Sequence, residues 1–325
     1  MPNRERLSVV FSFKNEEEVL PELLERMKHV LGGLDLDYEM IFVNDASLDL
    51  SLLILSQAAE HEERIKILTM TRSFGVTPCF MAGIRHAQGD AVIVMDCDLQ
   101  DPPEVIPALV EKWREGAEIV YTVRTKRRGE SVFKTWLTRA AYSILNKLSE
   151  IPFPVDAGEF KLMSRRAVQE LVKIDEKDAY LRGLVLSLGF RQVPVYYERQ
   201  PRPAGKSHFP LTHPGPHKTF LSGLISFSFW PLAFSFLVGF FSLLAAALGF
   251  FALAAQFVRG QKVDTHLILF FGQCFLGAVQ LFSIGLLGLY VGRIYQQSLP
   301  RPSYIIDSKI NFKESESRLT ASLNE

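Results

Sequence analysis

The fold is decided by the stretch Val92-Ile93-Val94-Met95-Asp96-Cys97-Asp98-Leu99-Gln100-Asp101-Pro102-Pro103. Its four leading apolar, mostly β-branched residues are typical of a buried strand, which ends at two aspartates one residue apart. Because side chains alternate along a strand, Asp96 and Asp98 are expected on one face at the edge of a sheet. Hard oxygen ligands of this kind favour Mg²⁺ or Mn²⁺, with open positions left for substrate phosphates. The alternative is an aspartate pair that only caps the following helix.

Charge is balanced over the whole chain but not along it. The 325 residues include 36 Lys+Arg and 36 Asp+Glu, so the overall charge does not indicate a nucleic-acid partner. Neither 220–258 nor 265–292 contains Asp, Glu, Lys or Arg. Each run exceeds the roughly 20 residues that cross a bilayer, which predicts transmembrane helices at 231–258 and 265–292. A buried hairpin in a large soluble core is the alternative.

The other segments are assigned around these two spans. We expect a globular domain over 1–210, an interfacial amphipathic segment over 211–230, and a tail over 293–325 that is poorly ordered from about Lys309. The N-terminus lacks the long apolar stretch of a signal peptide, so the first domain is expected in the cytoplasm. Two spans return the tail to the same side. The pattern therefore favours a multi-pass protein of the inner (plasma) membrane with both termini cytoplasmic.

Strand and helix patterns alternate through the first domain. Strand-like apolar runs occur at 7–13, 38–43, 65–70, 91–95, 119–123 and 192–197. Amphipathic helical patterns are found over 16–31, 132–148 and 167–172, the first ending at Gly32-Gly33. This alternation predicts an α/β fold, a mostly parallel sheet sandwiched by helices. Such sheets bind ligands beyond the carboxyl ends of their strands.

Taken together, the motifs resemble those of the family 2 glycosyltransferases, and within them the polyprenyl-phosphate sugar transferases. That group includes undecaprenyl-phosphate glucosyltransferases, the aminoarabinose transferase and dolichyl-phosphate mannose synthase. The likeness covers nearly the whole chain and depends on the order and spacing of several short motifs. These are Asn15-Glu16-Glu17, Asp45-Ala46-Ser47-Leu48-Asp49, Arg72-Ser73-Phe74-Gly75, the stretch from Asp96 to Pro103, Asp156-Ala157-Gly158-Glu159-Phe160, Arg202 to Phe209, and Leu289-Tyr290-Val291-Gly292-Arg293-Ile294-Tyr295.

The resemblance implies a GT-A, Rossmann-like fold and a defined reaction. A single sugar would pass, with inversion, from a nucleotide sugar to a polyprenyl phosphate such as undecaprenyl phosphate, for assembly or modification of cell-surface glycans. Asn44, Ser73, Val76 and Cys97 stand where the family usually has other residues. These departures concern the identity of the donor rather than the class of reaction.

The donor site is expected at the first strand ends and at the aspartate pair. Asp98 is the leading ligand of Mg²⁺ or Mn²⁺, with Asp96 and Gln100 close to the same ion, which would stabilise the leaving diphosphate. The residues expected to bind the nucleotide are Ser12, Phe13, Asn15, Glu16, Asn44, Asp45, Asp96 and Cys97. The amide of Asn44 matches the donor and acceptor groups of uracil, which favours a UDP-sugar such as UDP-glucose. Alternatively, Asn44 only shapes its turn.

The acceptor phosphate requires cations near the membrane. The residues expected to bind it are Arg124, Arg128, Arg202, Lys206, Ser207 and His208. Contact with anionic lipid head groups is the alternative for these basic residues. Asp156, Asp98 and Arg202 are the candidate catalytic residues, with Asp156 near the anomeric carbon. Glu159 is a weaker candidate, because a solvent-facing position on a strand fits it equally well.

Two other functions fit parts of the sequence. A processive membrane polysaccharide synthase shares the nucleotide-binding half, but its Gln-x-x-Arg-Trp motif does not occur in this sequence. The changes at Asn44, Ser73 and Val76 are the best evidence for a catalytically silent membrane scaffold. The intact Asp98, Gln100, Asp156 and Arg202 argue against it. Small residues along both apolar runs allow close helix contacts. The resemblance also suggests a homo-oligomer, such as a tetramer.

Overall fold

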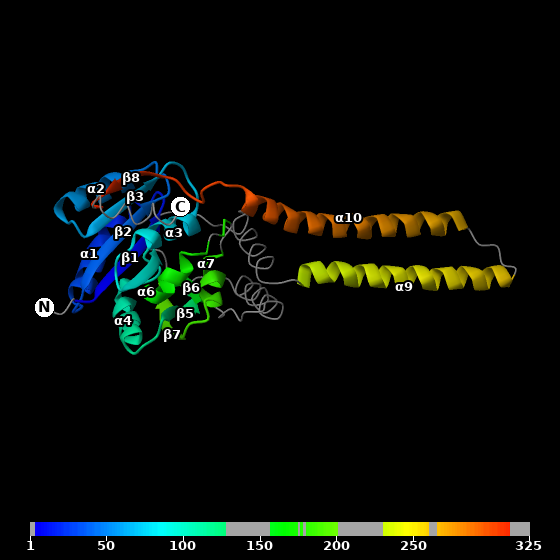
Figure 1. Cartoon of the computed structure of the whole chain (residues 1–325), viewed down its shortest axis with the longest axis horizontal. Helices are drawn as coiled ribbons and strands as arrows, with labels where there is room; N and C mark the ends of the chain where they lie inside the picture. The colour runs from blue at the N-terminus through cyan, green and yellow to red at the C-terminus, as the bar shows by residue number, and fades with distance from the viewer. Residues whose placement is uncertain are drawn as a thin grey trace. The chain divides into compact units, whose positions relative to one another are not determined.

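The computed structural model describes residues 4–127, 157–174, 176–177, 180–200, 230–259 and 265–312 (Figure 1). The chain forms two compact units. One comprises Met1–Asn146, Ile151–Pro216 and Arg301–Glu325, and the other Lys147–Glu150 and His217–Pro300. The first is built on a sheet and the second on two long helices. Each is described by itself.

The sheet unit contains an eight-stranded mixed sheet in the order β7-β5-β6-β4-β1-β2-β3-β8. The strands are β1 (Arg6–Phe13), β2 (Asp37–Asn44), β3 (Ile65–Met70), β4 (Ala91–Asp96), β5 (Ile119–Arg127), β6 (Ala157–Ser164), β7 (Gln192–Arg199) and β8 (Ile306–Ile310). Neighbours in the run β4-β1-β2-β3 are parallel, as is the pair β5-β7. The predicted parallel arrangement is therefore confirmed for the centre of the sheet. β6 and β8 pair antiparallel with their neighbours, which makes the whole sheet mixed.

Helices pack on both faces of this sheet. They are α1 (Leu20–Gly32), α2 (Ser51–His61), α3 (Val76–His86), the 3₁₀ turn η1 (Pro103–Val105), α4 (Ile106–Arg114), α6 (Arg165–Leu171) and α7 (Leu181–Ser187). α1, α2 and α4 share one apolar core with β1, β2 and β4, in which Phe11 and Phe42 stack with ring centroids 4.6 Å apart. α3 packs on the opposite face through Gly83, which lies against Val10 and Val43. Cover on both faces explains why the central strands β1 and β2 are buried from their second residue to their last.

Two predicted helices begin elsewhere than the pattern suggested. α1 starts at Leu20 rather than at residue 16, because a turn precedes it and Pro21 occupies its first turn. Its predicted apolar stripe is confirmed, since Leu23 and Met27 are among its buried residues. α6 starts at Arg165 because the hydroxyl of Ser164 accepts a hydrogen bond from the backbone N–H of Ala167.

The expectation that the chain is poorly ordered from about Lys309 is wrong for residues 309–312, and the rest of the tail, 313–325, lies outside the described residues. β8 continues through Lys309 to Ile310 and pairs with β3. Beyond it, the side-chain amide of Asn311 donates to the carbonyls of Ala59 and Ile65, both at 2.9 Å. The sequence hides this strand because an edge strand pairs through its backbone and needs no apolar alternation.

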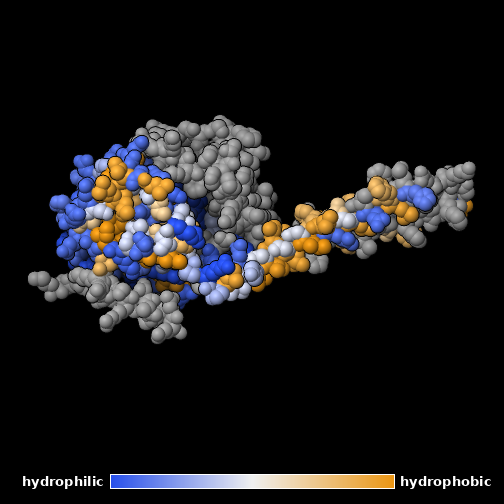
Figure 2. Space-filling model, turned by 90° about the horizontal axis from the view of Figure 1, so that it is seen from above, coloured by the Kyte–Doolittle hydropathy of each residue, from blue (hydrophilic) through white to orange (hydrophobic). Residues whose placement is uncertain are grey.

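The helical unit consists of α9 (Trp230–Val258) and α10 (Thr265–Ser298), which lie side by side (Figure 1). Among the described residues, Ile268–Ser298 is the one segment long and apolar enough to cross a membrane, and Leu237–Gly249 is a shorter apolar helix. Figure 2 shows apolar surface along this unit, to which the exposed side chains of Phe240, Leu248 and Phe282 contribute. One span is therefore supported by length and composition, and α10 runs beyond the predicted end at residue 292.

The predicted helix over 132–148 lies outside the described residues, and so does the interfacial segment, except for Trp230 at its end. In contrast, all six predicted strands correspond to observed ones: β1, β2, β3, β4, β5 and β7. β6 and β8 are the additional strands. They attach antiparallel on either side of the predicted parallel core.

Close packing of α3 on the sheet gives a testable prediction about stability. A Cβ atom at Gly83 would lie 2.2 Å from Cγ1 of Val10 and 3.2 Å from Cγ2 of Val43. We expect Gly83→Ala to lower the free energy of unfolding by about 1–3 kcal/mol through overpacking, although alanine favours a helix. Gly32→Ala is the matched control, because nothing lies within 4 Å of its Cβ position. Thermal unfolding that shows Gly83→Ala as stable as Gly32→Ala would contradict this packing.

Candidate functional site

The ends of three parallel strands bring the predicted donor residues together. In the register of the sheet Ser12 pairs with Asp96, and Phe13 pairs with Asn44. The polar residues that follow β1, β2 and β4 therefore meet at one carboxyl edge, as the sequence predicted. Ser12, Phe13, Glu16 and Cys97 are buried just inside this edge, and burial raises the pKa of Cys97 well above its ordinary value.

The turn after β4 presents the predicted metal ligands. Leu99 adopts a φ of 56°, which is uncommon for a residue other than glycine, and its side chain is buried. The half-buried Asp98 and Gln100 stand on either side of it, and the backbone N–H of Gln100 donates to Oδ1 of Asp98 at 3.1 Å. The buried leucine thus anchors a turn that carries a carboxylate and an amide as neighbours.

The electrostatics of this turn suit a cation. Burial raises the pKa of Asp96 to about 7, and the nearby Asp98, Asp101 and Glu159 contribute to the rise, while Arg124 opposes it. A divalent ion beside Asp96 and Asp98 would relieve the repulsion between these carboxylates. Within the described part of the chain no group of three His, Cys, Asp or Glu side chains is arranged to hold a metal. Two carboxylates with substrate oxygens and water are sufficient for Mg²⁺.

Several predicted nucleotide-binding groups are engaged in holding the strand-end loops. Oδ1 of Asn44 accepts the backbone N–H of Ser47 at 2.8 Å, so the turn-shaping interpretation of Asn44 is the one that the contacts support. Because Oδ1 of Asn44 is engaged in the turn, it does not support the predicted preference for a uridine nucleotide. In the same way, Oδ1 of Asn15 accepts the backbone N–H of Leu48 at 2.8 Å.

Asp45 performs a similar role across two loops. Its buried carboxylate accepts the hydroxyl of Ser73 at 2.7 Å and the backbone N–H of Phe74 at 2.6 Å. Nζ of Lys14 in turn donates to the hydroxyl of Ser73 at 2.9 Å. The loops that follow β1, β2 and β3 are thereby tied into one rim. The carboxylate of Asp45 therefore stabilises this rim through hydrogen bonds.

Glu159 on β6 is ion-paired with two cations, so it is not the unpartnered solvent-facing residue that the sequence also allowed. Its Oε1 accepts Nε of Arg182 at 2.6 Å, and Nζ of the buried Lys161 lies 3.5 Å from Oε2. Burial by itself would raise the pKa of Glu159, but Lys161 and Arg182 lower it to about 2. The carboxylate therefore stays ionised. Sequence reasoning missed both cations, because neither belongs to a recognisable motif.

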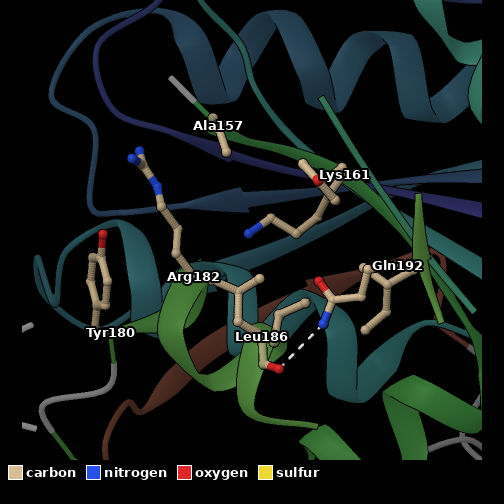
Figure 3. A pocket seen from close by; sticks show the side chains of 10 residues that line it. Ala157, Lys161, Tyr180, Arg182, Leu186 and Gln192 are labelled. Atoms are coloured by element: carbon tan, nitrogen blue, oxygen red, sulfur yellow. Dashed lines mark hydrogen bonds between the residues drawn. The ribbon is translucent and has the colours of Figure 1, made fainter. Parts of the chain in front are cut away.

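A small hollow that is open to solvent lies beside these ion-paired side chains (Figure 3). It is lined by Ile119, Tyr121, Ala157, Gly158, Lys161, Tyr180, Arg182, Val185, Leu186 and Gln192. In Figure 3 the charged groups of Lys161 and Arg182 extend into the space between β6 and α7. Ala157, one of the lining residues, directly follows the predicted catalytic residue Asp156 in the chain.

Arg124 is the one predicted acceptor cation that falls within the described residues. Its side chain on β5 is largely buried, and its Nε donates to the hydroxyl of Tyr197 at 3.1 Å. That hydroxyl donates to Asp101, a fully buried carboxylate in the turn after β4. Burial and the Asp101 charge raise the pKa of Tyr197, so it remains a donor. Asp101 and Tyr197 are functional candidates that the sequence analysis did not single out.

The remaining predicted site residues cannot be placed. Asp156, Arg128, Arg202, Lys206, Ser207 and His208 all lie outside the described residues. The structure therefore assembles the donor and metal side of the predicted site, together with one cation of the acceptor side. In the chain, Arg128 directly follows β5, Asp156 directly precedes β6, and Arg202 comes three residues after the end of β7.

Comparisons with known proteins agree with this picture. The family model Glycosyl transferase family 2 matches residues 8–172. The uncharacterized glycosyltransferase YkcC of Bacillus subtilis is 37% identical over 303 residues, which cover 92% of this chain and 92% of that protein. The bactoprenol glucosyl transferase of Shigella phage SfV is 35% identical over 308 residues, covering 94% and 99%.

Among solved structures, glucosyl-3-phosphoglycerate synthase from Mycobacterium tuberculosis aligns with 68% of this chain and 79% of that one. The TM-score is 0.46 at 21% identity. The family match and the full-length relatives agree with the motifs at the strand ends. The chain belongs to glycosyltransferase family 2.

Proposed function

We propose that this protein transfers one sugar, with inversion, from a UDP-sugar such as UDP-glucose to a polyprenyl phosphate at the cytoplasmic face of the membrane. The observation that carries the proposal is the Asp96–Asp98 turn at the carboxyl edge of the sheet, in a chain that also contains an apolar helix long enough to span a bilayer. A relative named for bactoprenol glucosyl transfer, 35% identical over 94% of the chain, supports this acceptor.

On the donor side, Asp98 would be the main protein ligand of Mg²⁺ or Mn²⁺, with Asp96 and Gln100 beside it. When bound, the ion supplies positive charge to the diphosphate as it leaves the anomeric carbon. The chain itself contributes a pre-formed rim. Asp45 holds the loop after β3, and Asn44 holds the turn after β2, so that the nucleotide would meet fixed backbone groups.

On the acceptor side, the lipid phosphate would be bound by Arg124, Arg128, Arg202, Lys206, Ser207 and His208. A phosphate monoester has a second pKa of about 6, so it is largely anionic at neutral pH and needs little help from a base. Asp156 would therefore orient the acceptor or stabilise positive charge on the sugar ring. The phosphate oxygen attacks the anomeric carbon as the bond to the nucleotide diphosphate breaks.

The membrane arrangement is part of the proposal. An amphiphilic acceptor places its phosphate at the surface and its tail in the bilayer, which suits a sugar-transfer domain attached to membrane helices. α9 and α10 would both span the inner membrane and leave the two termini in the cytoplasm. Assembly into a homo-oligomer is proposed through the small residues on these helices.

The reaction can be tested directly. Purified protein is incubated with labelled UDP-glucose, Mn²⁺ or Mg²⁺ and undecaprenyl phosphate, and then extracted with organic solvent. Labelled, solvent-soluble lipid is the expected product. Water-insoluble polymer would instead identify a processive synthase. Absence of any product across a panel of nucleotide sugars would leave the scaffold interpretation.

Substitution of Asp98, the proposed metal ligand, should impair sugar transfer and metal-dependent UDP binding without unfolding the protein. Asp98→Asn is expected to lower kcat by about 100-fold or more and to weaken Mn²⁺-dependent binding of UDP, because the diphosphate loses its charge partner. The matched control is Asp35→Asn, since that side chain is 91% exposed at the other edge of the sheet. Calorimetry that finds equal Mn²⁺-dependent UDP affinity in both variants would refute the role of Asp98.

The acceptor role of Arg202 gives a second kinetic prediction. Arg202→Ala should reduce kcat/KM for the lipid phosphate by about 10- to 100-fold, the effect of losing a charge-assisted hydrogen bond, while UDP affinity stays within about twofold. Arg166→Ala is the control, because the Arg166 side chain is 72% exposed and belongs to neither side of the site. Equal losses in lipid turnover and UDP binding would argue against an acceptor role.

A further inference from the structure

A buried charge cluster connects the metal-binding turn to the strands on the acceptor side. It consists of Asp101, Arg124, Tyr197 and Arg199 and is called the Asp101 cluster below. Asp101 is fully buried three residues after Asp98, and its Oδ1 accepts the hydroxyl of Tyr197 and lies 3.4 Å from Nε of Arg199. Its Oδ2 lies 3.6 Å from Nη2 of Arg124 and receives no hydrogen bond from any residue that the structure describes.

The cluster holds the guanidinium of Arg124 from several sides. Nε of Arg124 donates to the hydroxyl of Tyr197, and a Cβ atom on Gly158 would lie only 2.9 Å from Nη2. The ring of Tyr197 is itself fixed, because it packs edge-on against Phe160 with centroids 6.3 Å apart. The hydroxyl of Thr125 donates to the backbone carbonyl of Tyr197 at 3.0 Å. The orientation of Arg124 therefore depends on Tyr197.

The charge of the cluster is not balanced internally. Two guanidinium groups face one carboxylate, so one positive charge is in excess. The Arg124 charge also acts on the carboxyl of Asp96, so the guanidinium is electrically close to the donor side. A buried cation that is held rigidly between the metal-binding turn and β7 is suited to binding an incoming anion.

The cluster also joins both predicted acceptor segments to the metal turn. The backbone N–H of Gln200 donates to the carbonyl of Gln100 at 3.1 Å, which ties the end of β7 to the proposed metal site. In the chain, Arg202 comes two residues after Gln200, and Gly158 comes two residues after Asp156. A single buried carboxylate thus lies where the donor turn, β5 and β7 come together.

We infer that Asp101 and Tyr197 are positioning residues, which act through Arg124 to hold a cation for the phosphate of the lipid acceptor. The inference rests on the proposed function and deepens it. Neither residue needs to touch substrate. Asp101 fixes the hydroxyl of Tyr197, and Tyr197 directs Nε of Arg124 so that its remaining donors face the acceptor. Glycine at position 158 leaves room for that guanidinium, which a Cβ atom there would displace.

The test compares two adjacent tyrosines on β7. Tyr197→Phe removes the bridging hydroxyl and keeps the ring, whereas Tyr196→Phe removes a hydroxyl from a side chain that is 66% exposed. The full-length variants are studied in detergent micelles with three probes: farnesyl phosphate, farnesol, and UDP with Mn²⁺. Tyr197→Phe should weaken binding of farnesyl phosphate by about tenfold, leave farnesol unchanged, and alter UDP affinity by less than about twofold. Tyr196→Phe should match wild type with every probe.

A second variant guards against an effect on folding. Gly158→Ala keeps Tyr197 and Asp101 but crowds Nη2 of Arg124, and the same selective loss for farnesyl phosphate is expected. Unchanged binding of farnesyl phosphate in both variants would overturn the inference, as would equal losses for farnesyl phosphate and UDP. If wild type itself does not distinguish farnesyl phosphate from farnesol, the proposed acceptor is wrong and the inference falls with it. Selective loss in the variants, with wild type discriminating, supports both.

Discussion

The constraint on which the site depends is the crowding of carboxylates at the end of one buried strand. Asp96, Asp98, Asp101 and Glu159 act on one another in a region of low solvent access. The protein compensates two of them with its own cations. Glu159 is paired with Arg182 and Lys161, and Asp101 with Arg124 and Arg199. Burial and the neighbouring carboxylates raise the pKa of Asp96 to about 7, so its ionised form would be stabilised by a metal ion bound beside it.

Around that charge, the loops are held by side chains that the sequence suggested for substrate binding. Asn15, Asn44 and Asp45 hydrogen-bond to backbone groups of neighbouring loops. These bonds connect the ends of β1, β2 and β3, so the rim is organised before a ligand arrives. A rim of this kind lowers the entropic cost of binding, because few groups remain to be ordered. Its polar residues contribute to recognition chiefly through the backbone geometry that they impose.

The strands β6, β7 and β8 connect distant parts of the chain to the same sheet. β6 brings Gly158 and Glu159 beside β4 and β5, and β7 brings Tyr197 and Arg199 beside β5. β8 attaches the segment that follows α10 to β3. The backbone N–H of Thr71 also donates to the carbonyl of Ile305 at 3.1 Å, next to the loop that Asp45 holds. The segment that follows α10 thus pairs with the sheet whose carboxyl edge forms the candidate donor site.

The sequence by itself determined the features encoded by local periodicity. Apolar runs and amphipathic stripes identified the strands β1 to β5 and β7 and the helix α1, and the uncharged run at 265–292 identified an apolar helix. Parallel order then implied that Asp96 meets Ser12 at one edge, as the register shows. These inferences succeeded because burial imposes a repeat that neighbouring residues reveal.

Only the tertiary structure decided the partners of the buried charges. Asp101 accepts a hydrogen bond from Tyr197, which lies 96 residues away in the sequence, and Glu159 accepts one from Arg182, which lies 23 residues away. No local sequence pattern indicates such pairs. The turn-holding role of Asn44 and the edge strand β8 were likewise set by backbone hydrogen bonds, which almost any side chain permits. Whether a polar residue binds a ligand or supports a loop depends on which donors the fold brings within about 3 Å of it.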